Sequence, residues 1–141
     1  MGFQPNIINL VVGVETPTYN VNKQNPNENT MNNMPECPIE LVFELIGNKW
    51  KVRILRDLLD GQKRFGELKK STGASQKSLT THLRELEEDE IVIRKAYPQI
   101  PPKVEYSLTD VGLSLAPILD AMAGWGTDYK KYCELKEKLK R

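Results

Sequence analysis

Residues 75–88, SQKSLTTHLRELEE, carry lysine, arginine and hydroxyl side chains at first and mostly carboxylates at the end. Leu79, Leu83 and Leu86 recur at helical spacing, which turns the polar residues between them to the opposite side of a helix. Lysine, arginine, serine and threonine can hydrogen-bond the phosphates and base edges of DNA. Carboxylates at a helix C-terminus oppose the helix macrodipole, so they are not placed there for helix stability. The pattern predicts a helix, here called the reader helix, whose first turns enter a major groove while its acidic end lies outside. The residues of this segment expected to contact DNA are Ser75, Gln76, Lys77, Ser78, Thr80, Thr81 and Arg84.

Further cations lie on both sides of the reader helix, although the formal net charge of the chain is only +1. A solvated helix face with randomly placed charges would explain the reader helix alone about as well. The short helix expected before it and the two strands expected after it favour DNA binding. The flanking residues expected to contact DNA are Lys63, Arg64, Arg94, Lys95 and Lys103.

Apolar spacing and helix-ending residues define the elements that would position these side chains. Gly47 and Asn48 separate the first two helices, and both residue types tolerate the left-handed conformation of a helix end. Gly73 ends a short third helix, and Ser75 caps the reader helix. The expected elements are helices over 38–46, 50–59, 65–71 and 75–89, strands over 91–97 and 103–108 joined by the proline-rich loop 98–102, and a last helix capped by Thr109. This order is typical of a winged helix-turn-helix, so we expect a mainly α fold with a small β-hairpin (α+β), the wing being 91–108.

The length of 141 residues suits one domain with a hydrophobic core. Composition separates an Asn- and Pro-rich flexible arm or over-extended leader at 1–35 from the rest of the chain, in which we expect a domain at 36–126 and a helical extension at 127–141. The apolar run 7–14 is too short to span a membrane and lacks the positive region of a signal peptide; if ordered, it could form an edge strand. We therefore expect a cytoplasmic protein with no membrane partner, on the nucleoid when bound to DNA. The sequence contains no glycine-rich phosphate loop or metal-ligand cluster, so no cofactor or metal is expected.

The last helix carries an apolar pattern that begins at Val111 and repeats in alternating steps of four and three residues. Such a heptad pattern is typical of helices that pack along a seam. Packing onto the protomer's own core is the alternative, but a terminal helix has little core left to cover. Pro117 should bend this helix or mark its start. The pattern thus predicts a C-terminal dimerisation helix, with two reader helices about 34 Å apart. The expected interface residues are Leu115, Ile118, Met122, Trp125, Tyr129 and Tyr132.

Cys37 precedes Pro38 at the expected start of the first helix. Cysteine at the N-cap, proline at the first helical position and Glu40 at the third would form a capping box. Backbone N–H groups at a helix N-terminus favour a thiolate, whereas the Glu40 carboxylate opposes it. A small capping residue is the equally weighted alternative to a reactive thiol. A thiol enzyme would also need a base, and the single histidine, His82, lies on the reader helix at the edge of the leucine stripe. We therefore expect no catalytic residue and no enzyme activity.

The segment from CPIELVFELIGNKW through RFGEL and LRELE to PPKVEYSLTDVG resembles the HxlR-type winged helix regulators of bacteria over about residues 36–126. The resemblance implies a homodimeric, sequence-specific transcription factor that binds a two-fold operator in double-stranded DNA. It assigns RFGEL to the supporting helix, 76–84 to the reader and 94–103 to the wing. Several members of the family sense electrophiles or oxidants through the cysteine that corresponds to Cys37, which implies such an effector here. The family commonly has glycine where this chain has Glu90, and a glutamate forced into a left-handed conformation there would cost about 1 kcal/mol.

Two other functions are compatible with the same fold. A winged helix can serve for protein contact alone, which predicts no salt-dependent binding to duplex DNA. A MarR-like regulator would bind a small molecule between the wing domain and the dimer helices, but the sequence shows no long N-terminal dimerisation helix.

Overall fold

The computed structural model describes residues 34–141, so the apolar run 7–14 and nearly all of the expected arm lie outside the described residues. The expected mainly α fold with a small antiparallel sheet is confirmed. The elements in chain order are α3 (Pro38–Ile46), α4 (Lys49–Leu59), β1 (Lys63–Arg64), α5 (Phe65–Thr72), α6 (Gln76–Glu88), β2 (Val92–Tyr97), β3 (Lys103–Leu108), α7 (Asp110–Leu113) and α8 (Ala116–Lys140).

Leucine and isoleucine side chains from α4, α5 and α6 form the centre of the core. Leu79, Leu83 and Leu86 are buried, as the spacing of the reader helix predicts, and they meet Ile54 and Leu55 of α4. Full burial of one such side chain stabilises the fold by about 1.5–3 kcal/mol. The core therefore fixes which face of α6 points to solvent.

The sheet has three strands rather than the expected two, in the order β1-β3-β2. β1 pairs antiparallel with β3, Lys63 opposite Tyr106 and Arg64 opposite Glu105. β2 and β3 form the expected hairpin, with Val92 opposite Leu108 at its base. The additional strand attaches the start of α5 to the wing.

Local capping residues end and begin the helices on either side of the reader. Gly73 ends α5 with φ 74°, a left-handed conformation that glycine adopts without steric cost. Ser75 then caps α6, its Oγ accepting a hydrogen bond from the N–H of Ser78 at 3.1 Å. The left-handed conformation expected at Gly47 and Asn48 is wrong. Gly47 has φ −71°, and Asn48 has the extended backbone of an N-cap because α4 begins immediately after it.

The expected single C-terminal helix is divided into α7 and α8. Thr109 caps α7, not the long helix: its Oγ1 accepts from the Gly112 N–H and donates to the Glu90 carbonyl at 2.6 Å. Glycine is required at 112, because a Cβ there would collide with the Ile91 carbonyl oxygen. Pro117 lies in the first turn of α8, so it marks the start of that helix, one of its two expected effects.

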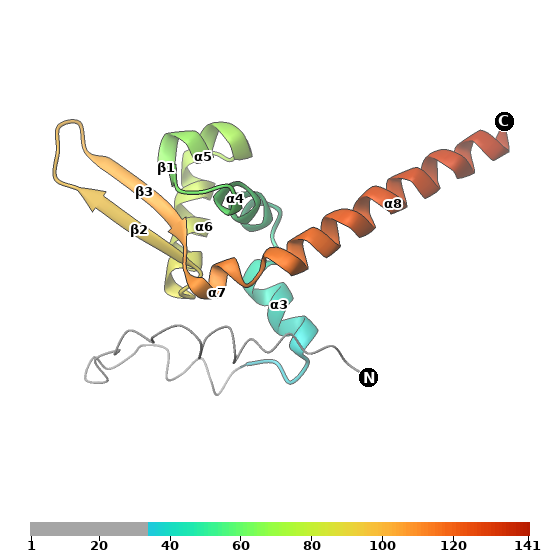
Figure 1. Ribbon diagram of the computed structural model, residues 1–141, viewed down its shortest axis with the longest axis horizontal. Helices are drawn as coiled ribbons and strands as arrows, with labels where there is room; N and C mark the ends of the chain where they lie inside the picture. The colour runs from blue at the N-terminus through green and yellow to red at the C-terminus, as the bar shows by residue number, and fades with distance from the viewer. Residues whose placement is uncertain (1–33) are drawn as a thin grey trace.

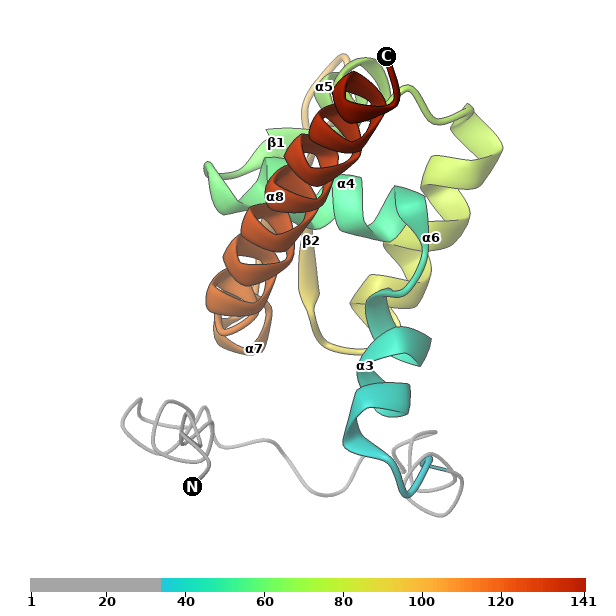
Figure 2. The same cartoon turned by 90° about the vertical axis from the view of Figure 1, so that its right-hand side faces the viewer.

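The elements are arranged with the wing and α8 far apart. Figure 1 shows the β2–β3 loop toward one end of the longest axis and the C-terminus of α8 toward the other. Figures 1 and 2 both place α3 and α7 toward one end of the molecule and α5 toward the opposite end. The long helix α8 projects away from the sheet and the reader helix (Figure 1).

Candidate nucleic-acid interface

The solvent face of α6 carries most of the side chains expected to contact DNA. Gln76, Lys77, Thr80, Thr81 and Arg84 are exposed. They occupy the first three turns of the helix, and Arg84 has no hydrogen-bond or ion-pair partner among the described residues. The carboxylate-rich last turn follows them. The helix therefore presents a cationic and polar N-terminal part to solvent, as the sequence predicts.

Both threonine hydroxyls of this face already donate a hydrogen bond within the helix. Thr80 Oγ1 donates to the Gln76 carbonyl at 2.7 Å, and Thr81 Oγ1 donates to the Lys77 carbonyl at 2.9 Å. Each oxygen keeps its lone pairs, so in this rotamer each threonine can accept a hydrogen bond but cannot donate one. An amino group on a base edge fits that requirement, whereas a phosphate oxygen does not.

Ser75 and Ser78 are less available than the other expected contacts. The Ser75 hydroxyl oxygen is the α6 cap, and Ser78 is half-buried with its Oγ 3.3 Å from Nδ1 of His82. His82 Nδ1 also lies 2.7 Å from the Ser78 carbonyl oxygen. A carbonyl can only accept, so Nδ1 carries the proton and the half-buried ring is tied to its own helix.

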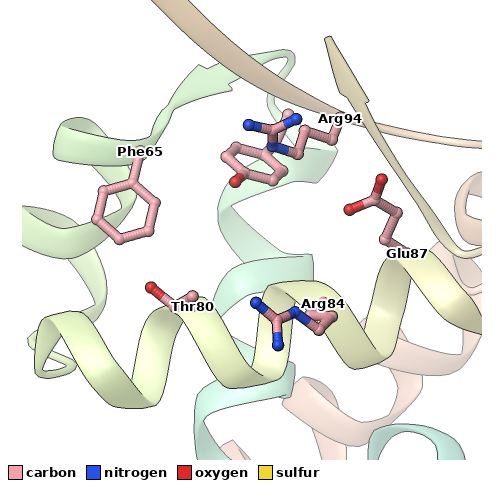
Figure 3. A pocket seen from close by; sticks show the side chains of 6 residues that line it. Phe65, Thr80, Arg84, Glu87 and Arg94 are labelled. Carbon is pink, nitrogen blue, oxygen red and sulfur yellow. The ribbon is translucent and has the colours of Figure 1, made fainter. Parts of the chain in front are cut away.

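Residues from four elements line one hollow between the reader helix and the sheet, with a volume of about 370 Å³. Figure 3 shows Thr80, Arg84 and Glu87 along α6, with Arg94 of β2 opposite them. Phe65 of α5 and Tyr106 of β3 complete the lining. The structure thus brings together two arginines that the sequence places ten residues apart on different elements. Neither has an ion-pair partner among residues 34–141, so both are free to neutralise phosphates.

The cations of the wing are held around one aromatic ring. Nζ of Lys95 and Nζ of Lys103 lie 5.1 and 4.8 Å from the centroid of the Tyr97 ring. Lys103 also pairs with Glu105 at 2.8 Å, and this hydrogen bond is the main cause that lowers the pKa of the Glu105 carboxyl. Part of the Lys103 charge is therefore neutralised within the wing. Lys95 has no carboxylate partner in the described chain.

The two cations before α5 differ in exposure. Lys63 is half-buried on β1 and Arg64 is exposed. The Arg64 backbone N–H donates to the Glu67 side chain at 2.8 Å, which secures the first turn of α5. Arg64 lies opposite Glu105 of the wing strand β3, and its charge contributes to the lowered pKa of that carboxyl.

One charged pair behind the interface is not anticipated by the sequence analysis. Lys51 of α4 is only 7 % exposed, and its Nζ lies 2.7 Å from Oε2 of Glu85 on the reader helix. The hydrogen bond from Lys51 lowers the pKa of the Glu85 carboxyl. Burial raises the pKa of Asp89, one turn further along. A signal existed, because Lys51 falls on the apolar stripe of α4 at helical spacing from Ile54 and Leu55.

Cys37 lies at the N-cap of α3 and is exposed. Pro38 occupies the first turn as expected, but the Cys37 side chain makes no capping hydrogen bond. The expected capping box with Glu40 is therefore wrong, and the thiol points to solvent instead of closing the helix end. Cys133, on α8, is half-buried.

Apolar side chains are exposed on α3 and α8, away from the wing. Trp125 is 69 % exposed and stacks on Tyr129 with ring centroids 5.2 Å apart, and Phe43 of α3 is 66 % exposed. Met122 and Tyr132 are exposed as well, whereas Leu115 and Ile118 are half-buried and Leu115 packs against the core. A groove of about 420 Å³, lined largely by residues of α3 and α4, reaches Met122 of α8.

Two further features of the described residues concern metal binding and membrane crossing. Residues 34–141 hold no group of three or more His, Cys, Asp or Glu side chains placed for a metal ion. No helix in this part of the chain is long and apolar enough to cross a membrane.

Comparison with known proteins identifies similar chains. The family described as HxlR-like helix-turn-helix matches residues 45–134. The uncharacterized HTH-type transcriptional regulator YdeP of Bacillus subtilis (strain 168) is 48% identical over 95 residues, which cover 67% of this chain and 74% of YdeP. YybR of the same organism, another uncharacterized HTH-type transcriptional regulator, is 44% identical over 108 residues, or 76% and 86% of the two chains.

Solved structures with the same fold include two proteins in their reduced forms. The redox regulator HypR in its reduced form matches with a TM-score of 0.66 and 44% identity, over 70% of this chain and 98% of that chain. The reduced form of the transcriptional regulator YodB from B. subtilis matches with a TM-score of 0.57 and 41% identity, over 64% of this chain and 91% of YodB.

Proposed function

Because the chain belongs to the HxlR-like helix-turn-helix family of transcriptional regulators, we propose that it binds a two-fold operator in double-stranded DNA as a cytoplasmic homodimer. In this proposal the first turns of α6 lie in a major groove and the wing lies on the backbone. The observation that carries it is the hollow lined by both Arg84 and Arg94, neither of which has an ion-pair partner among residues 34–141. Lys77, Lys95 and Arg64 extend this cationic surface on either side.

Fluorescence anisotropy with duplex DNA tests this proposal. We expect the protein to prefer duplex from the region upstream of its own gene over random duplex, with an affinity that falls steeply as salt increases. If that region lacks the operator, selection from a random duplex library supplies the specific sequence. Absence of binding to any duplex at low salt would contradict the proposal and favour a winged helix used for protein contact.

Arg84 separates base recognition from phosphate binding. If Arg84 reads a base, Arg84→Ala should weaken specific binding by roughly 1–3 kcal/mol and random-duplex binding much less. Arg84→Lys keeps the charge but loses the bidentate donor geometry, so it should then resemble Arg84→Ala. Lys138→Ala is the control, because it removes one charge near the far end of α8. Equal losses on specific and random duplex would assign Arg84 to phosphate.

The homodimer part of the proposal rests on the exposed apolar surface of α3 and α8. Phe43, Trp125 and Tyr129 together present large aromatic area that the rest of residues 34–141 does not cover. Exposed apolar area of this kind is typical of a self-association surface. A second copy packed on it would set two reader helices about 34 Å apart, one helical turn of DNA.

We also propose that Cys37 modulates DNA binding through its oxidation state. The support is its exposure at the start of α3, next to the apolar surface, and the similarity to HypR, a redox regulator. Diamide would take two hydrogens from two Cys37 thiols, one per protomer, and leave an intersubunit disulfide. The expected result is a changed duplex affinity and a dimer on non-reducing gels, both lost in Cys37→Ser and kept in Cys133→Ser. Unchanged affinity after complete modification of Cys37 would remove the switch from the proposal.

A further inference from the structure

A largely buried tyrosine lines the hollow between α6 and the sheet and keeps a free hydroxyl group. Tyr106 is only 7 % exposed, yet it lines this hollow together with Arg84 and Arg94. Its hydroxyl makes no hydrogen bond to any of residues 34–141, although it is not sealed from solvent. A tyrosine hydroxyl in a buried position usually has a hydrogen-bond partner. The hollow therefore offers a polar group that a bound molecule can use.

The register of the sheet explains why Tyr106 and a cation share one wall of the hollow. Arg94 of β2 lies directly opposite Tyr106 of β3, and such cross-strand neighbours project from the same face of a sheet. Arg84 faces them from α6 (Figure 3), and neither arginine has an ion-pair partner in the described part of the chain. Guanidinium groups bind carboxylates with two parallel hydrogen bonds, so the hollow is suited to an anion.

The other polar groups of the hollow limit the charge and the hydrogen bonding of that anion. Glu87 also lines the hollow, so two arginines and one glutamate leave a single positive charge, which favours a monoanion over a dianion. Thr80 Oγ1 can only accept a hydrogen bond, because it donates its proton to the Gln76 carbonyl at 2.7 Å. A fitting molecule therefore carries one negative charge and at least one hydrogen-bond donor.

Aromatic surface connects these polar groups. Phe65 and the ring of Tyr106 both line the hollow. In Figure 3, Phe65 lies toward Thr80, whereas Arg94 lies toward Arg84. A planar ring can therefore extend from the two arginines to Thr80 with Phe65 beside it. The volume of about 370 Å³ is near the lower end of small-molecule sites, which suits a molecule with one ring.

We propose that this hollow binds a single-ring aromatic carboxylic acid with a hydroxyl or amino group on the ring, and that this acid displaces DNA. The carboxylate lies between Arg84 and Arg94 and accepts a hydrogen bond from the Tyr106 hydroxyl. The ring substituent donates to Thr80 Oγ1. The displacement rests on the proposed function, in which both arginines belong to the DNA surface. Because a guanidinium group that holds the acid is no longer available to DNA, the acid is a direct competitor of the operator.

Isothermal titration calorimetry of the full chain without DNA tests the site itself. The probe is 4-hydroxybenzoate, compared with benzoate, which lacks the donor, and with 4-hydroxybenzamide, which lacks the charge. We expect 4-hydroxybenzoate to bind with a dissociation constant on the order of 0.1 mM, in keeping with its size of about ten non-hydrogen atoms. Benzoate and the amide should each bind about 5–10-fold more weakly. Equal binding of all three compounds would overturn the assigned contacts.

Two variants separate these contacts from nonspecific binding. Tyr106→Phe keeps the buried ring and removes only the free hydroxyl, so it should weaken 4-hydroxybenzoate binding about 5–10-fold without lowering the urea midpoint. Thr80→Val keeps the side-chain shape and removes the acceptor, so 4-hydroxybenzoate and benzoate should then bind alike. A preference for 4-hydroxybenzoate that persists in Thr80→Val would contradict the proposed orientation.

Phe43→Ser is the matched control. Phe43 lines the apolar groove of α3 and α4, the other place where an aromatic acid could bind. This variant should change the affinity for none of the three compounds. If it abolishes binding while Tyr106→Phe does not, the acid occupies the α3 groove and the inference is wrong.

Fluorescence anisotropy tests the displacement, with a duplex selected from a random library and constant ionic strength. The apparent dissociation constant for DNA should rise in proportion to the concentration of 4-hydroxybenzoate without reaching a limit. A coupling between two separate sites would instead reach a limit, which would overturn direct competition. Tyr106→Phe should need about 5–10-fold more acid for the same release of DNA.

Failure of this inference and failure of the proposed function are distinguishable. If 4-hydroxybenzoate produces no binding heat while the protein binds duplex, the inference fails and the proposed function stands. If the acid binds but no duplex does at low salt, the proposed function and the displacement both fail, and the hollow remains a small-molecule site.

Discussion

Lys51 and Glu85 link α4 to the back of the reader helix through an ion pair of 2.7 Å. Glu85 belongs to the acidic half of α6 that the sequence analysis places outside the DNA groove. Its carboxylate instead pairs with the buried ammonium group of Lys51. Removing one member of such a pair leaves the other charge without compensation. Part of the acidic end of α6 therefore has a structural reason.

The Lys51–Glu85 pair predicts a pH dependence of stability. Hydrogen bonding to Lys51 lowers the pKa of Glu85 below its ordinary value of 4.5. Its contribution is therefore fully present above about pH 4.5 and is lost as pH falls through the lowered value. Glu85→Gln should destabilise the protein by only about 1 kcal/mol at pH 7, since the Glu85 side chain is 45% exposed, and the difference from wild type should vanish in strong acid.

Urea denaturation between pH 7 and pH 3 measures this difference. Asp89→Asn is the control of opposite sign, because burial raises the pKa of Asp89 and its ionised form costs stability at neutral pH. That variant should therefore be at least as stable as wild type at pH 7. A Glu85→Gln penalty that is constant down to pH 3 would contradict the assigned role of the pair.

The individual contacts of the interface are partly predictable from sequence. The exposure of Lys77 and Arg84 follows from the leucine stripe alone, because helix periodicity fixes the opposite face. The placement of Arg84 and Arg94 around one hollow is not predictable in this way, since it depends on how the hairpin packs beside α6. The donor use of Thr80 and Thr81 depends on rotamers, which the sequence does not determine.

At the scale of elements, those with a clear period or a cap are predicted within one or two residues. The reader helix, expected over 75–89, is observed as Gln76–Glu88. β1 is missed because two residues show no period, and its pairing with β3 depends on the path of the chain after α4. The break between α7 and α8 is missed in part: Pro117 indicates a start, but residues 110–113 are also compatible with one continuous helix.

The junction between α6 and β2 gives a prediction for this scale. Glu90 has φ 58°, a left-handed conformation that glycine adopts without strain but glutamate does not. Glu90→Gly should raise the free energy of unfolding by about 0.5–1 kcal/mol, because it relieves this strain. Denaturant midpoints at constant m-value measure the effect.

Glu87→Gly is the matched control, an exposed glutamate within the helical part of α6. It should lower stability by about 1 kcal/mol through loss of helix propensity. If Glu90→Gly lowers stability by a similar amount, the left-handed conformation is not the dominant influence at this junction.

At the scale of the whole molecule, the expected DNA contacts and the most exposed aromatic residues lie on different elements. The cations expected to contact DNA lie on α6, β1 and the wing, whereas the most exposed aromatic residues lie on α3 and α8, and α8 also carries other lysines. Figure 1 shows the wing and α8 extending in different directions from the helical core. The formal net charge of +1 does not reveal this separation, which depends on the fold. A dimer formed through α3 and α8 would leave both cationic surfaces uncovered.

The proposed dimer gives a prediction for this scale. Trp125→Ala removes the most exposed of the expected seam residues and its stacking on Tyr129, so it should weaken self-association at least tenfold. Sedimentation velocity over a range of protein concentrations measures this. Affinity for a two-site operator should fall with it, while affinity for an isolated half-site should not.

Ile100→Ala is the control, since it removes exposed apolar area at the opposite end of the molecule. It should leave the monomer–dimer equilibrium unchanged. Unaltered association of Trp125→Ala would show that α8 does not form the seam and would direct attention to α3 alone.

The length of α8 has a mechanical consequence. Its 25 residues extend about 37 Å at 1.5 Å per residue. A rotation of about 10° at its base would move its far end by about 6 Å, more than the 3.4 Å rise of one base pair. The base of α8 adjoins the groove that α3 lines, and Cys37 begins α3. In the proposed dimer, a small rotation of α8 at its base would therefore displace its far end by more than the rise of one base pair.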